Sequence, residues 1–161
     1  MRWKERDRRD KIAVVLMGIY LFLVLCVTVI PRDFTLDPKW LYHESVPVTY
    51  VYWMPFRDLM AGYSDAGKQI LLNVVMTMPF GFLYGMIRKK PGLFSAVRAT
   101  FLLSLSIELF QLLTTVFLLY HRRCDVTDLI TNVTGGALGY LLYRFYLYLQ
   151  SQKQKSQLWR K

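Results

Sequence analysis

Side chains that commonly act as nucleophiles or bind transition metals are scarce in this chain of 161 residues, which has two cysteines and two histidines. Cys26 and Cys124 do not form a disulfide framework or a metal-ligand spacing, and we expect both to fill apolar space. His43 and His121 fall in predicted surface loops. The sequence also offers no nucleophile with an adjacent base and no glycine-rich phosphate loop. We therefore predict no cofactor and no metal site, and favour binding over catalysis.

Apolar residues, in contrast, are abundant: 54% of the chain is hydrophobic and 16% is aromatic. Four apolar segments are long enough to cross the hydrocarbon core of a bilayer, which is about 30 Å thick. The first lacks the polar face of a soluble helix and ends without a small-residue cleavage pair, so we expect an uncleaved anchor. The prediction is an all-α integral membrane protein with one domain over residues 1–161 and transmembrane helices at about 12–30, 70–87, 99–119 and 127–147.

Acidic residues are also few, and the net charge is +10. Six Lys or Arg residues lie in Met1–Lys11, four in Arg88–Arg98 and four in the basic tail, residues 150–161. The positive-inside rule places these three segments, and so both termini, in the cytoplasm. The charge is explained by membrane topology and anionic lipid, and we predict no nucleic-acid partner.

The loop over residues 31–69 is then extracellular, and it is rich in aromatic side chains. Amphipathic rings of this kind settle at the membrane interface, so the loop is either an aromatic belt or a cap over a ligand. The rings are those of Trp40, Tyr42, Tyr50, Tyr52, Trp53 and Phe56.

Polar residues inside the apolar segments are the strongest indication of function. Glu108 lies near the middle of the third segment, where a charge costs at least about 2.5 to 3.5 kcal/mol. Ser104 and Gln111 share its helix face. We expect Arg57 or Arg122 to supply the compensating charge.

A second polar face lies on the fourth segment, where Asp125, Asp128 and Asn132 follow i, i+3, i+7 spacing. Asp125 is also placed to cap the helix N-terminus. Together with Asn73 on the second segment and Glu108, these residues are expected to converge in the outer half of the bilayer. They form either an outward-facing polar pocket or a set of hydrogen bonds that joins the helices.

Small residues recur on two of the predicted helices. Gly81 and Gly85 on the second segment, and Gly135 and Gly139 on the fourth, have small-x-x-x-small spacing. This spacing permits close approach of helix backbones.

Four motifs in order resemble those of the VanZ-like family. They are YWMPFR at 52–57, NVVMTMPFGF at 73–82, SIELFQ at 106–111 and RRCDVTDLITNVTGG at 122–136. The sequence departs from the family at Tyr52, where the family usually has Asn, and at Cys124, where it often has an aromatic residue. The resemblance implies a protein of the bacterial cell membrane that lowers sensitivity to teicoplanin-type lipoglycopeptides.

Two mechanisms fit the residues and the resemblance. In the first, the pocket binds an amphiphile, either the lipid-bearing part of the antibiotic or a cell-wall lipid precursor, with membrane lipids as its surroundings. In the second, Glu108 and Asp128 form an acid/base pair, or together with Asp125 a site of oxygen ligands for a hard cation, and the protein modifies a lipid-linked envelope substrate. The predicted ligand-binding residues are Arg57, Asn73, Glu108, Gln111, Arg122, Asp125, Asp128 and Asn132.

Overall fold

Helices form nearly all of the secondary structure in the computed structural model, which describes residues 3–29, 51–118 and 124–158. The four long helices confirm the predicted all-α class. In chain order the elements are α1 (Trp3–Val29), β1 (Val51–Tyr52), α2 (Arg57–Met60), α3 (Ala66–Ile87), α4 (Leu93–Leu118), β2 (Cys124–Asp125) and α5 (Val126–Leu158).

Three of the long helices contain segments that are long and apolar enough to cross a membrane: Arg8–Thr28, Ala66–Ile87 and Leu93–Leu113. Helix α5 does not meet this standard. Its first half contains Asn132 and several threonines and glycines, which lower its mean hydropathy. The predicted fourth span is therefore a helix, but its composition alone does not make it a membrane span.

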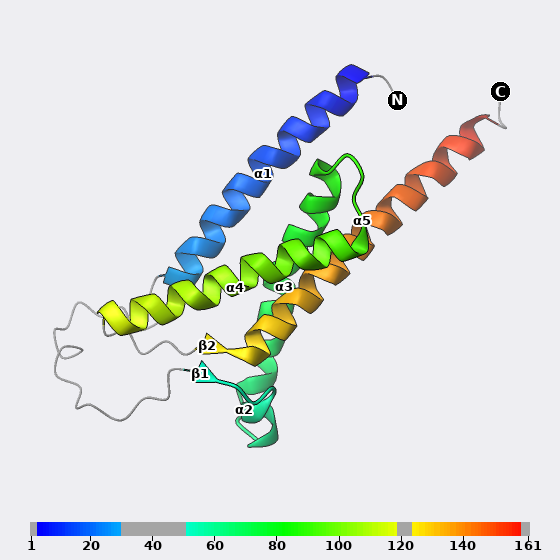
Figure 1. Ribbon diagram of the computed structural model, residues 1–161. Coiled ribbons are helices and arrows are strands. Elements are labelled where there is room, and N and C mark those ends of the chain that lie inside the picture. The colour runs from blue at the N-terminus through cyan, green and yellow to red at the C-terminus, as the bar shows by residue number, and fades with distance from the viewer. Residues whose placement is uncertain (1–2, 30–50, 119–123, 159–161) are drawn as a thin grey trace.

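The close packing of α3 against α5 forms the centre of the fold (Figure 1). A Cβ atom added to Gly81 would lie 1.9 Å from the carbonyl oxygen of Gly136, and one added to Gly139 would lie 1.9 Å from that of Met78. A side chain cannot fit at such distances, so the two backbones touch only because these positions are glycine. The small residues predicted to permit close packing therefore lie in the interface between α3 and α5.

The other two long helices pack around this pair. α4 lies against α5, where Gly136 meets the buried Thr100. α1 packs mainly on α3, and the Tyr20 hydroxyl donates a hydrogen bond of 2.9 Å to the Met76 carbonyl. The buried Tyr140 of α5 donates one of 3.0 Å to the carbonyl of Pro91, which fixes α5 to the α3–α4 link.

The molecule has two ends that are formed by different elements, as Figure 1 shows. The start of α1, the α3–α4 link and the last turns of α5 lie at one end, and α2, β1 and β2 lie at the other. Most of the predicted aromatic loop, including Trp40, Tyr42 and Tyr50, falls outside the described residues. Its last part differs from the expectation, because α3 begins at Ala66 and takes in residues assigned to the loop.

Candidate functional site

The strands β1 and β2 bring the first and last sequence motifs together. Although they are far apart in the chain, they pair in parallel, with Val51 opposite Cys124 and Tyr52 opposite Asp125. A second contact joins the two motifs a few residues further along the chain, where the backbone N–H of Phe56 donates a 2.9 Å hydrogen bond to the Thr127 hydroxyl. Phe56 has a positive φ of 57°, which is costly for a residue other than glycine and reverses the chain into α2.

The third motif joins this pair through Glu108. Glu108 is 3% exposed, and its carboxylate accepts a 3.1 Å hydrogen bond from the backbone N–H of Asp125. The Asp125 side chain in turn accepts a 2.7 Å bond from the N–H of Thr127, so it caps α5 as expected. The thiol of Cys124 also bonds to Glu108, and burial, followed by the negative charge of Glu108, raises the pKa of Cys124 to about 11. We expected Cys124 only to fill apolar space, but its thiol also takes part in this hydrogen-bonded cluster.

The second motif completes the cluster through Asn73. Its amide nitrogen donates a hydrogen bond to Asp128. One turn deeper, the Thr77 hydroxyl donates a 2.7 Å bond to the backbone carbonyl of Asn132. The four motifs therefore meet at the end of the fold that contains α2, β1 and β2.

Asn132 and Ser104 form a buried polar layer below these carboxylates. The Asn132 side chain is 2% exposed, and its amide nitrogen donates a 2.9 Å hydrogen bond to the Ser104 hydroxyl. Within the described part of the chain, its Oδ1 has no hydrogen-bond partner. Because this layer is sealed between helices, Asn132 joins α5 to α4 rather than facing outward.

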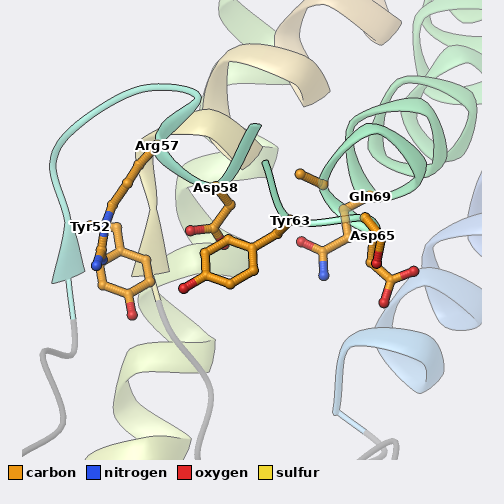
Figure 2. Close-up of a pocket in the computed structure, with 8 residues that line it drawn as sticks. Tyr52, Arg57, Asp58, Tyr63, Asp65 and Gln69 are labelled. Carbon is orange, nitrogen blue, oxygen red and sulfur yellow. The ribbon is translucent and has the colours of Figure 1, made fainter. Parts of the chain in front are cut away.

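An open pocket of about 550 Å³ lies beside the cluster. Figure 2 shows Tyr52 and Arg57 on one side of it and Asp65 on the other, with Asp58, Tyr63 and Gln69 between them. The guanidinium of Arg57 lies 4.5 Å from the centre of the Tyr52 ring. The lining of the pocket is predominantly polar and consists of Tyr52, Arg57, Asp58, Tyr63, Ser64, Asp65, Ala66 and Gln69.

A second cavity of about 20 Å³ lies between this pocket and the carboxylates. It shares Asp58, Ala66 and Gln69 with the pocket, and Asp125 and Asp128 line it as well. A cavity of this volume holds about one water molecule. Asp125 and Asp128 therefore line a small space whose walls belong in part to the open pocket as well.

Within the described residues, no group of three His, Cys, Asp or Glu side chains is placed to hold a metal ion.

The remaining predicted ligand-binding residues lie in different places. Gln111 is half-buried on α4, one turn beyond Glu108. Arg122, a predicted ligand-binding residue, lies outside the described ranges. Arg57, which was expected to compensate Glu108 or bind a ligand, lines the pocket and stacks on Tyr52.

Comparison with known proteins agrees with the four-motif resemblance. The VanZ/LLP1 family matches residues 17–148. Protein VanZ of Enterococcus faecium is 33% identical over 129 residues, which cover 80% of this chain and 71% of that protein. This chain belongs to the VanZ-like family. No solved structure matches it.

Sequence reasoning named the buried residues of this cluster and, among the residues that line the open pocket, Tyr52 and Arg57. The interior residues were visible because a polar side chain is unusual within an apolar helix. Tyr63, Asp65 and Gln69 were missed because they lie in an exposed stretch where polar residues are ordinary. The one available sign was the grouping of two acids and two tyrosines with Arg57 within residues 52–69, which has no helical spacing.

Proposed function

We propose that α5 is a fourth transmembrane helix and that both termini are cytoplasmic. The support is the distribution of side chains around α5. Thr131 and Asn132 are buried against other helices, whereas Leu138, Leu142 and Phe145 are exposed. An apolar outer surface over a polar inner face is the pattern of a helix that contacts lipid outside and protein inside. Most of the polar and small residues in its first half, which lower its mean hydropathy, are then buried against other helices and do not contact lipid.

The orientation follows from the two ends of the fold. The basic segments at the start of α1, at the α3–α4 link and at the end of α5 share one end of the molecule (Figure 1). The positive-inside rule makes this end cytoplasmic. The pocket at the opposite end then opens to the outer surface, where envelope lipids and antibiotics are found.

In this position the pocket is a site for the polar head of an amphiphile. Next to the pocket, the apolar side chains of Leu59 and Met60 on α2 are 50% and 61% exposed. They offer a surface for a lipid chain, while the pocket offers hydrogen bonds to a head group. The observation that carries the proposal is this open polar pocket of about 550 Å³, which adjoins the point where the four motifs meet.

The protein then lowers sensitivity to teicoplanin-type lipoglycopeptides by binding an amphiphile at the outer surface. The ligand is either the lipid-bearing part of the antibiotic or a cell-wall lipid precursor. Family membership supports the antibiotic connection, and binding fits the buried carboxylates better than catalysis. Glu108 is buried and accepts a hydrogen bond from the backbone N–H of Asp125, and Asp125 caps α5. Both carboxylates therefore stabilise the structure of the site.

The test is the teicoplanin sensitivity of a susceptible Gram-positive host that expresses the chain. We expect the full chain to raise the inhibitory concentration, and Arg57→Ala to abolish the increase. Lys68→Ala is the matched control, because it removes the same charge from an exposed position that does not line the pocket. Immunoblots of membranes must show equal abundance.

Two further arms separate binding from chemistry. Glu108→Gln keeps an oxygen that accepts the Asp125 N–H but cannot transfer a proton as a carboxylate does, so we expect protection to persist. Loss of protection in Glu108→Gln at equal abundance would favour the enzymatic alternative. Protection should also be weaker against a glycopeptide that lacks a lipid chain, and equal protection would contradict the role of the apolar surface.

A further inference from the structure

The charges around the open pocket limit what it can bind. Arg57 offers only hydrogen-bond donors, whereas the carboxylates of Asp58 and Asp65 offer acceptors. The pocket therefore has two carboxylates and one guanidinium, and Asp125 and Asp128 add two more carboxylates in the adjoining cavity. This excess of negative charge disfavours the binding of an anion such as a phosphate. The positive charge of the Arg57 guanidinium in the lining also weakens the binding of a simple ammonium ion. A neutral ligand with many hydroxyl groups uses donors and acceptors alike, because each hydroxyl both donates and accepts.

The shapes of the lining side chains select further among neutral ligands. The guanidinium, the two carboxylates and the amide of Gln69 each present two polar atoms in one plane. Such a pair can bond two neighbouring hydroxyls on a ring. The Tyr63 side chain is 63% exposed, so the flat face of its ring is open to a ligand, whereas Arg57 covers the Tyr52 ring.

From this arrangement we infer that the pocket binds a glycosyl head group. A pyranose has a C–H face that packs on an aromatic ring and an edge of hydroxyls that bonds planar polar groups. The volume of about 550 Å³ lies within the range of small-molecule sites and leaves room for more than one sugar ring. The inference rests on the proposed function for its membrane setting, and it names the head group of the proposed amphiphile.

Binding is tested with the full chain, purified in a polyoxyethylene detergent because a glycoside detergent would occupy the site. Saturation-transfer NMR with methyl glucoside and methyl N-acetylglucosaminide should show transfer to the sugar-ring C–H protons. Tyr63→Leu should weaken binding about tenfold or more, and Asp65→Asn should weaken it similarly through the lost charged hydrogen bond. Tyr148→Leu is the control, because it removes a tyrosine of similar exposure from the second half of α5, and this tyrosine does not line the pocket.

Titration with inorganic pyrophosphate and with ethylammonium provides the comparison. The inference is overturned if either ion binds while neither glycoside does, or if glycoside binding is unchanged in both Tyr63→Leu and Asp65→Asn. These outcomes do not depend on antibiotic protection. Protection without glycoside binding would reject only the sugar, and glycoside binding without protection would reject only the proposed function.

A competition arm identifies the source of the sugar. Displacement of the methyl glycoside by vesicles that contain glycosyl diacylglycerol would assign a lipid head group. Displacement by a soluble glycopeptide would assign the antibiotic. Displacement by neither would overturn the assignment to a glycosyl head group.

Discussion

At the scale of single residues, the ionisation of the Cys124 thiol depends on the carboxylates around it. Burial and the negative charge of Glu108 raise the pKa of its thiol to about 11, and only the thiolate reacts with alkylating reagents. At pH 8 about one thiol in a thousand is then ionised. In a Cys26→Ala background, we expect the rate of reaction with iodoacetamide to keep rising from pH 8 to pH 10.

Replacing the neighbouring acid provides the control for this prediction. Glu108→Gln removes the charge that opposes ionisation of Cys124, so the alkylation rate should level off at a lower pH. A wild-type rate that is half-maximal near pH 8.5, as for an ordinary thiol, would show that Cys124 does not share a buried site with Glu108.

The residues found from the sequence are those that break a local pattern. Glu108 and Asn132 were identified because apolar helices rarely contain such side chains, and both prove to be buried hydrogen-bonding groups. The left-handed backbone of Phe56 had no comparable sign, because neither glycine nor asparagine marks the position. Its conformation depends on a hydrogen bond to Thr127, far along the chain, and local sequence does not encode that contact.

At the scale of elements, the contact between α3 and α5 depends on glycine. We expect Gly81→Ala to destabilise the protein by about 1 to 3 kcal/mol, because the new methyl group would overlap the backbone of Gly136. Neither backbone can move without shifting a whole helix. Unfolding in mixed micelles with increasing dodecyl sulfate measures the effect.

Gly67→Ala is the control on the same helix. No atom lies within 4 Å of the Cβ position at Gly67, so the substitution should be neutral or slightly stabilising. Equal losses of stability in Gly67→Ala and Gly81→Ala would mean that the cost comes from the helix itself and not from its contact with α5.

The elements also differ in how far the sequence predicts them. Long apolar segments gave the helices, although α4 begins before and α5 ends after the expected spans, since helices continue through polar residues beyond the apolar core. The strands β1 and β2 were not predicted. Each has two residues, too few for an alternating pattern, and their pairing depends on how the helices bring distant segments together.

At the scale of the whole molecule, α5 decides how many times the chain crosses the membrane. Its 33 residues are about 50 Å long, which exceeds the hydrocarbon core of about 30 Å. Ser64 lies in the pocket at one end of the molecule, and Ser156 lies near the opposite end of α5. If α5 spans the bilayer, these two positions face opposite sides.

Cysteine labelling tests this arrangement in intact cells. In a background of Cys26→Ala and Cys124→Ser, which keeps a hydrogen-bond donor beside Glu108, a membrane-impermeant maleimide should label Ser64→Cys at once. Ser156→Cys, at a position that is also exposed in the structure, should react only after the membrane is permeabilised. Labelling of both positions in intact cells would remove α5 from the membrane, whereas the reverse pattern would keep the four spans and turn the pocket toward the cytoplasm. Either result would contradict a site that meets its ligand at the outer surface.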